Sequence, residues 1–187
     1  MISRDTALNI VTSHIQNKNL VKHCLAVEAA MKGLAKYFNE DEELWGLAGL
    51  LHDADWEECR TNIEEHTHKT VGWIKEAGGD EKIIKAILSH NYAHNGHNPP
   101  NNNMEWALYT CDELTGLIVA TALVRPEKKL SSVTPESVMK KMNAKAFAAA
   151  IDRDQIKMCE EKLGIKLEDF IEIILKSMQD ISSSLGL

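Results

Sequence analysis

The spacing of apolar residues predicts helices along almost the whole chain. Apolar side chains recur every three or four positions rather than every second one, which is the period of a helix with one buried face. We therefore expect an all-α helical bundle. The predicted helices begin with one capped by Ser3 or Asp5 that ends near residues 17–19, followed by residues 20–38, 42–52, 63–77, 80–90, 104–124, a short helix from Thr134, then 152–163 and 167–183.

Two segments lack the helical period and are predicted to be loops. Residues 54–62 are aromatic and charged without a repeat, which is typical of a surface loop. Residues 91–103 carry five asparagines and two prolines from Asn95 onward, so we expect a long loop there. Long loops inside compact domains are often functional, so this segment is a candidate for substrate contact.

Size and composition indicate one domain spanning residues 1–187. The chain has 187 residues, of which 44% are apolar and 26% charged, and this is an ordinary globular composition. No apolar stretch approaches the roughly 18 residues of a membrane span, and the start lacks the pattern of a signal peptide. We therefore expect a cytoplasmic protein without membrane contact. The four cysteines stand far apart, which indicates neither a disulfide framework nor a thiolate zinc site.

Charge is distributed unevenly along the chain. The net charge of −7 argues against binding to a nucleic acid polymer, which needs clustered lysine and arginine. Residues 125–166 nevertheless hold 10 basic side chains against 6 acidic ones. This segment is either a solvated helix surface or a wall that binds an anionic substrate. In the second case Arg125, Lys128 and Lys129, which follow the long helix, contact a substrate phosphate.

Histidine and aspartate residues form the pattern with the clearest chemical meaning. His52 and Asp53 close an apolar helix, where an imidazole beside a carboxylate needs a hydrogen-bonding partner or a cation. One histidine on an apolar face is more often a hydrogen-bonded core residue than a metal ligand. Several such residues on separate helices instead indicate a site for divalent metal, and the others here are His23, His66, His68, His90 and Asp112.

The order and spacing of these residues resemble the HD-domain superfamily of metal-dependent phosphohydrolases. The motifs that carry the resemblance are KHCLAVEAAM, WGLAGLLHDADWE, IIKAILSHN and CDELTGLIVATALVRPEKKL, with ligand separations of 29, 13, 24 and 22 residues. The chain looks most like small bacterial and archaeal members of the HDIG type. The resemblance implies an HD core at about residues 20–125 and a helical C-terminal extension at about residues 126–187.

The resemblance also implies two divalent ions, which are Mn, Fe, Co, Ni, Zn or Mg. By this comparison the first ion is held by His23, His52, Asp53 and Asp112, and Asp53 bridges to a second ion on His66 and His90. The distance along the chain to Gly78 and Asp80 favours His66 over His68 as the ligand. His68 is then either a surface residue or a substrate contact.

The activity expected from the resemblance is hydrolysis of a small phosphate ester, with a nucleotide as the predicted substrate. Two ions activate a hydroxide that attacks phosphorus. Beside Asp53, Asp55 either orients or deprotonates this water or caps a helix end. His94 and His97, in the Asn-rich loop, either protonate the leaving group or are solvated.

Two other functions share this ligand set. An HD-type di-iron oxygenase, such as inositol oxygenase, uses His and Asp ligands to activate O₂, and the full six-ligand set favours it. A non-catalytic regulatory module would also keep the metal. The basic segment at residues 125–166 favours the phosphohydrolase. The sequence leaves open the identity of the metal, the type of ester and the oligomeric state.

Overall fold

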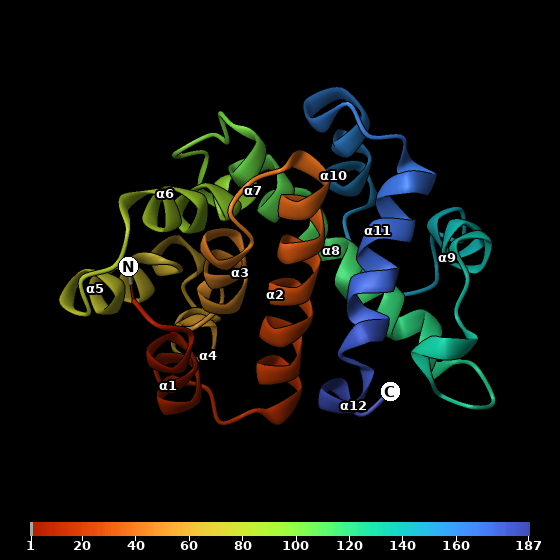
Figure 1. Ribbon diagram of the computed structural model, residues 1–187, viewed down its shortest axis with the longest axis horizontal. Helices are drawn as coiled ribbons and strands as arrows, with labels where there is room; N and C mark the ends of the chain where they lie inside the picture. The colour runs from red at the N-terminus through yellow and green to blue at the C-terminus, as the bar shows by residue number, and fades with distance from the viewer. Residues whose placement is uncertain (1) are drawn as a thin grey trace.

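The computed structural model describes residues 2–187, and every regular element in that range is helical, which confirms the all-α class (Figure 1). The first half of the chain forms α1 (Arg4–His14), α2 (Lys18–Phe38), α3 (Glu42–Leu51), α4 (Trp56–Cys59), η1 (Ile63–Glu65), α5 (His68–Glu76), α6 (Glu81–His90) and α7 (Tyr92–Asn95). The second half forms α8 (Asn103–Leu123), η2 (Leu130–Ser132), α9 (Pro135–Met142), α10 (Arg153–Met158), η3 (Cys159–Leu163), α11 (Leu167–Asp180) and α12 (Ser182–Leu185). Within residues 2–187, none of these helices combines the length and the apolar character needed to cross a bilayer.

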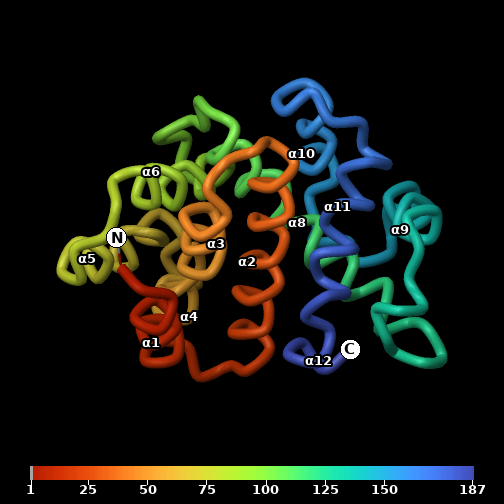
Figure 2. The backbone as a smooth tube through the Cα atoms, in the orientation of Figure 1, coloured from red at the N-terminus to blue at the C-terminus, as the bar shows by residue number. Residues whose placement is uncertain are grey.

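The two longest helices, α2 and α8, form the centre of the bundle (Figures 1 and 2). Helix α2 packs on α3 at one side and on α8 and α11 at the other. Helix α3 is almost entirely apolar and buried, as its composition predicts. Its close approach to α2 requires a glycine, because a Cβ at Gly49 would lie 2.6 Å from the carbonyl oxygen of Val27.

Helix starts follow the capping signals in the sequence. The side chain of Ser3 accepts a hydrogen bond from the Thr6 amide at the start of α1, and that of Asp80 accepts one from Lys82 at the start of α6. Thr134 and Ser137 form a reciprocal capping box around the proline that opens α9. The polar residues between apolar stretches therefore fix where these helices begin.

The predictions for residues 54–77 were partly wrong. Residues 54–62 are not a surface loop, since Ala54 and Asp55 are fully buried and α4 follows them. Residues 63–77 are not one helix, because the chain breaks between η1 and α5 at Thr67, whose φ of 79° is left-handed. Tertiary hydrogen bonds to Asp55, described below, hold this break and override the local helical pattern.

The C-terminal helices pack back on the core rather than extending away from it. Helix α11 lies against α2, and α10 and η3 lie against α8 (Figure 1). The predicted helix at 152–163 contains a π-helical end, η3, before Gly164 turns the chain with a φ of 69°. The Asn-rich segment 91–103 contains one short helix, α7, in an otherwise irregular path.

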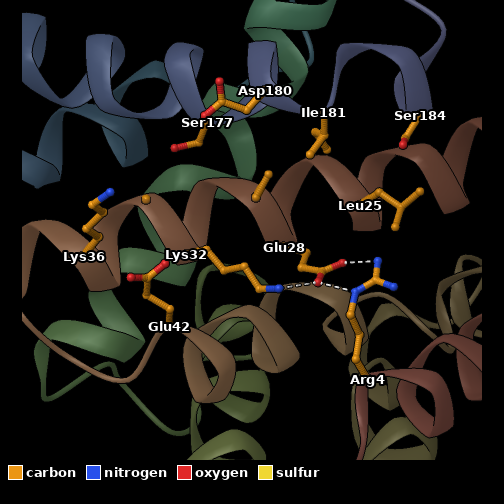
Figure 3. A pocket seen from close by; sticks show the side chains of 12 residues that line it. Arg4, Leu25, Glu28, Lys32, Lys36, Glu42, Ser177, Asp180, Ile181 and Ser184 are labelled. Atoms are coloured by element: carbon orange, nitrogen blue, oxygen red, sulfur yellow. Dashed lines mark hydrogen bonds and ion pairs between the residues drawn. The ribbon is translucent and has the colours of Figure 1, made fainter.

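A buried carboxylate joins α1 to α2 beside a cavity of about 390 Å³ (Figure 3). Glu28 is 5% exposed, and its oxygens accept hydrogen bonds from Arg4 Nε at 2.7 Å and Arg4 Nη2 at 2.9 Å. Lys32 Nζ lies 3.0 Å from the same carboxylate. The bidentate guanidinium contact orients α1 on the bundle.

We expect Glu28→Ala to lower the free energy of unfolding by about 1–3 kcal/mol, because it removes charged hydrogen bonds from a buried position. Urea denaturation measures this change. The matched control is Glu43→Ala, since Glu43 contacts the same Lys32 at 3.5 Å but is 67% exposed at its side chain. That variant should change stability by less than about 1 kcal/mol, and equal losses in both variants would contradict the structural role of Glu28.

Candidate metal centre

Six side chains from five separate parts of the chain meet beside α2 and α8. Each comes from an element that the bundle fixes in place, and the aspartates sit beside apolar segments that hold their backbones. The imidazoles of His52, His66 and His90 are buried. The six residues are His23 on α2, His52 and Asp53 directly after α3, His66 between η1 and α5, His90 at the end of α6, and Asp112 in the middle of α8.

The carboxylate of Asp53 lies between two pairs of imidazoles. Its Oδ1 atom is 3.2 Å from His66 Nε2 and 3.5 Å from His90 Nε2. Its Oδ2 atom is 3.6 Å from His52 Nε2 and 3.8 Å from His23 Nε2. One carboxylate therefore faces two distinct sets of nitrogen donors.

The second carboxylate, Asp112, completes the set on the His23 side. Its Oδ1 atom lies 2.9 Å from His23 Nε2 and 3.5 Å from His52 Nε2. Ligand atoms of these three residues lie within 4.8 Å of one another, and the same holds for His52, Asp53 and His90. Nitrogen and oxygen donors grouped in this way suit a divalent transition metal.

Hydrogen bonds behind the rings direct the Nε2 atoms inward. His52 Nδ1 donates to the Gly49 carbonyl at 2.7 Å, and His90 Nδ1 donates to the Ile87 carbonyl at 2.8 Å. Because a carbonyl oxygen only accepts hydrogen bonds, each Nδ1 must carry a proton. The neutral ring then presents the lone pair of Nε2 to the centre, which is the tautomer that a metal ligand requires.

Two features of the centre call for a cation, and the residues present therefore fit divalent metal. The Nε2 atom of His52 is buried and has no hydrogen-bonding partner. In addition, Nε2 of His66 and Nε2 of His90 lie 3.1 Å apart, although the Nδ1 atom of each ring already donates elsewhere. Two facing lone pairs repel each other unless a proton or a metal ion lies near both.

The charges of the centre shift the pKa values of its members. Burial lowers the basicity of His52, but the charges of Asp53 and Asp112 outweigh it and raise the pKa of His52 to about 9. Burial lowers the pKa of His66 as well, but hydrogen bonds to Asp53 and Asp55 outweigh this effect and raise the pKa of His66 to about 9. Burial lowers the pKa of His90. Without metal, protons therefore compensate the two central carboxylates.

Asp55 is bound on both oxygens and does not line the cavity. Its Oδ1 atom accepts hydrogen bonds from His66 Nδ1 at 2.7 Å and from the Thr67 amide at 3.1 Å. Its Oδ2 atom accepts from the amides of Lys69 and Thr70 at 3.1 Å each. The expectation that Asp55 orients or deprotonates the attacking water is therefore corrected, because Asp55 caps α5 from a distance and holds the ring of His66.

We expect Asp55→Asn to weaken metal binding by about 10- to 100-fold, because the amide group cannot accept all four hydrogen bonds and releases His66. Isothermal titration with Mn²⁺ measures the affinity. Asp80→Asn is the matched control, since Asp80 also caps a helix but lies outside the centre. It should retain wild-type affinity, and unchanged affinity in Asp55→Asn would contradict the positioning role.

A cavity of about 330 Å³ opens onto the six residues. Its wall contains His23, Asp53, His66, His90 and Asp112, whereas His52 lies behind them and is fully buried. The other lining residues come from five separate parts of the chain, and they are Leu20, Trp56, Asn91, His94, Glu113, Gly116, Ile151 and Gln155. The cavity is large enough for a small molecule that contacts the centre directly.

The structure does not bring the predicted basic residues to this cavity. Helix α8 continues for eleven residues beyond Asp112, about 16 Å along its axis, and Arg125, Lys128 and Lys129 follow the end of the helix. No lysine or arginine is among the described residues that line the cavity. Arg125, Lys128 and Lys129 are therefore not part of the cavity wall, and their contact with a substrate phosphate stays a prediction from sequence.

The predicted histidine contacts separate into two groups. His94, on α7, lines the cavity and is exposed at its mouth. His68 is exposed at the start of α5, and His97 is exposed in the loop; neither lines the cavity. Of the pair near the start of α5, the structure places His66 at the centre and His68 outside it.

Sequence reasoning missed several lining residues. Glu113 follows the ligand Asp112 directly, and this adjacency was the available signal. Burial and the charge of Asp112 raise the pKa of Glu113 to about 7. Gln155, on α10, donates to the Tyr109 carbonyl at 2.6 Å and closes the cavity from the C-terminal extension. No local pattern marks Gln155, because its position depends on long-range packing.

Comparison with known families agrees with the geometry. Residues 20–123 match the family described as HD domain, and this range covers more than half of the chain. The match includes all six residues of the centre, while Ile151 and Gln155 of the cavity wall lie beyond it. Neither a curated protein nor a solved structure matches the chain.

Proposed function

We propose, from the premise that the chain belongs to the HD-domain family of metal-dependent phosphohydrolases, that it hydrolyses a small phosphate ester at a centre holding two divalent ions. The observation that carries this proposal is the position of Asp53, whose two oxygens face different pairs of imidazole Nε2 atoms. A single ion bound to one pair would leave the Nε2 lone pairs of the other pair without a cation.

The residues divide into two sets for the two ions. His23, His52 and Asp112 would hold the first ion, and His66 and His90 would hold the second. Asp53 contributes one oxygen to each set. When bound, two divalent ions polarise a phosphoryl oxygen and lower the pKa of a water.

The charge balance of the centre supports an anionic substrate. The two central carboxylates, Asp53 and Asp112, are fewer than two divalent cations require for neutrality, so the loaded centre is positive. The cavity wall carries no lysine or arginine among the described residues. Recognition of a phosphate therefore depends on the loaded centre, and the lysine and arginine side chains of residues 125–166 are not part of the cavity wall.

Residues of the cavity wall can manage the protons of the reaction. Hydrolysis adds the oxygen of water to phosphorus and breaks the bond from phosphorus to the ester oxygen, which leaves as an alcohol and takes up a proton. Glu113 is suited to supply that proton from Oε1, because it lines the cavity directly after Asp112, its burial raises its pKa, and its Oε2 accepts a hydrogen bond from the Asp152 amide at 3.1 Å. His94, at the mouth, is the second candidate.

Phosphate release tests the proposal. The protein is freed of metal, reloaded with Mn²⁺ or Co²⁺, and assayed on nucleotides, sugar phosphates and simple phosphate monoesters and diesters, with O₂ consumption followed in parallel. Because a diester yields a monoester, a phosphatase added after the reaction converts that product to phosphate. We expect phosphate release that chelator abolishes and added metal restores. O₂ consumption with a polyol or a phosphonate and no phosphate release would indicate an oxygenase, and neither activity would indicate a regulatory metal module; either result overturns the proposal.

A further inference from the structure

A second, largely apolar cavity continues from the metal centre. It has a volume of about 400 Å³ and lies between the start of α2, the second half of α8 and residues 185–187. These last residues come after α11, at the point where α12 packs on α2 (Figure 1). We call it the aliphatic groove; its wall consists of Asn19, Lys22, His23, Gly116, Val119, Leu123, Leu185, Gly186 and Leu187. His23 and Gly116 line both this groove and the cavity over the centre.

One face of α8 runs through both cavities. Asp112, Gly116, Val119 and Leu123 are separated by four, three and four residues, so they lie along one side of the helix. From the ligand Asp112 to Leu123 this side extends about 16 Å. Leu123 is 50% exposed and the following Val124 is 58% exposed, so the far end of the groove presents apolar surface to solvent.

Gly116 forms the connection between the two cavities. A glycine inside a helix is destabilising relative to alanine, and here close packing does not require it. A Cβ at Gly116 would meet only Ile151 Cδ1, at the ordinary contact distance of 3.6 Å. By contrast, a Cβ at Gly49 would collide with backbone atoms. Gly116 lines both cavities, so its missing side chain leaves room at the boundary that they share.

We propose that the aliphatic groove holds the hydrocarbon part of the substrate's alcohol, so that the substrate is a phosphate ester of an apolar alcohol. This inference rests on the proposed function, since it places the phosphate at the centre and the alcohol beyond Gly116. The polar lining residues Asn19, Lys22 and His23 all lie on the first two turns of α2. On the other walls, Val119, Leu123 and Leu185 carry only apolar side-chain atoms, which offer no hydrogen bonds to a nucleobase. These side chains favour a hydrocarbon over the nucleoside expected from sequence.

Binding of phosphonates tests the groove without any turnover. Methyl-, butyl- and octylphosphonate keep the anionic group but have no ester bond to hydrolyse. Isothermal titration of the Mn²⁺-loaded protein should show affinity rising by up to about fourfold for each methylene that becomes buried. Octylphosphonate should then bind at least about 100-fold more tightly than methylphosphonate, and metal removal should abolish binding of both.

Two variants locate this preference in the groove. Gly116→Leu fills the connection, and Leu123→Glu puts a charge at the far end on an already exposed position. Each should reduce the ratio of octyl- to methylphosphonate affinity at least about tenfold. Gly72→Leu is the matched control, because Gly72 is also inside a helix with open space at its Cβ but lies on α5, away from both cavities. It should retain the wild-type ratio.

The outcomes separate this inference from the proposed function. Four results would each overturn the groove as the alcohol site. They are equal affinity for the three phosphonates, a chain-length preference that survives both variants, octylphosphonate binding without metal, and tighter binding of a nucleoside phosphonate. If phosphate esters are hydrolysed at rates independent of chain length, the hydrolase stands and the groove fails. If the phosphonate preference appears but no ester is cleaved, the groove stands and the hydrolase fails.

Discussion

Asp53→Ala should remove bound metal from the centre and reduce phosphate release by roughly 1000-fold or more. Asp53 is the one residue that faces both sets of imidazoles, so its loss affects both ions at once. Each ion contributes several kcal/mol of charge stabilisation in the transition state, and each 1.36 kcal/mol changes the rate about tenfold. Metal analysis after dialysis and a phosphate-release assay measure the two effects.

Two further variants make this result interpretable. Asp53→Asn keeps the side-chain volume and removes the charge, so a folded Asp53→Asn protein with little metal separates ligation from packing. Asp154→Ala removes an exposed carboxylate whose ion pair with Lys157 lies on the surface, and it should keep full metal content and turnover. Wild-type metal content in folded Asp53→Ala would contradict the assignment of the bridging position.

Metal and pH should have opposite effects on stability between pH 6.5 and about 9. The pKa values of His52 and His66 are raised in the folded metal-free protein to about 9, from about 6.5 in the unfolded chain. The contribution of these two protonated histidines to the free energy of unfolding is fully present below pH 6.5 and is lost as pH rises through 9. The metal-free protein should therefore melt at a lower temperature as pH increases. Metal needs unprotonated imidazoles, so the rise in Tm on metal addition should grow over the same range.

The size of the metal effect follows from mass action. At a metal concentration of about 1000 times Kd the folded state gains roughly 4 kcal/mol, which corresponds to a rise in Tm of about 8–16 °C for a chain of this size. Thermal scans at pH 6.5, 7.5 and 8.5, with and without Mn²⁺, measure both trends. His52→Gln should weaken the fall in Tm of the metal-free protein with rising pH, whereas His97→Gln, in the exposed loop, should keep that fall. A rise in Tm on metal addition that becomes smaller with rising pH would contradict this account.

The helical architecture could be predicted from sequence because its signals are local. Periodic apolar residues and caps such as Asp80 mark helices that the structure forms almost as expected. The segment at residues 54–77 could not be predicted in the same way. Its path depends on the four hydrogen bonds of Asp55, which come from residues 11 to 15 positions away and fix a left-handed backbone at Thr67.

The candidate site shows the same division between local and long-range information. The order of the six residues indicated a shared centre, and the structure brings them together. Arg125 was expected near the phosphate because it follows the helix of Asp112, but α8 continues for eleven residues beyond Asp112 and Arg125 does not line the cavity. Gln155 reaches the cavity from a helix that packs on α8 only in the folded chain.

Counting the ions bound per chain tests the central claim most directly. Metal-free protein is titrated with Mn²⁺ while electron paramagnetic resonance records the free ion and any magnetic coupling between bound ions. The account predicts two ions per chain that are coupled through their short separation, and loss of that coupling in Asp53→Ala. One ion per chain at saturation, or two uncoupled ions whose binding survives Asp53→Ala, would contradict a dinuclear centre bridged by Asp53.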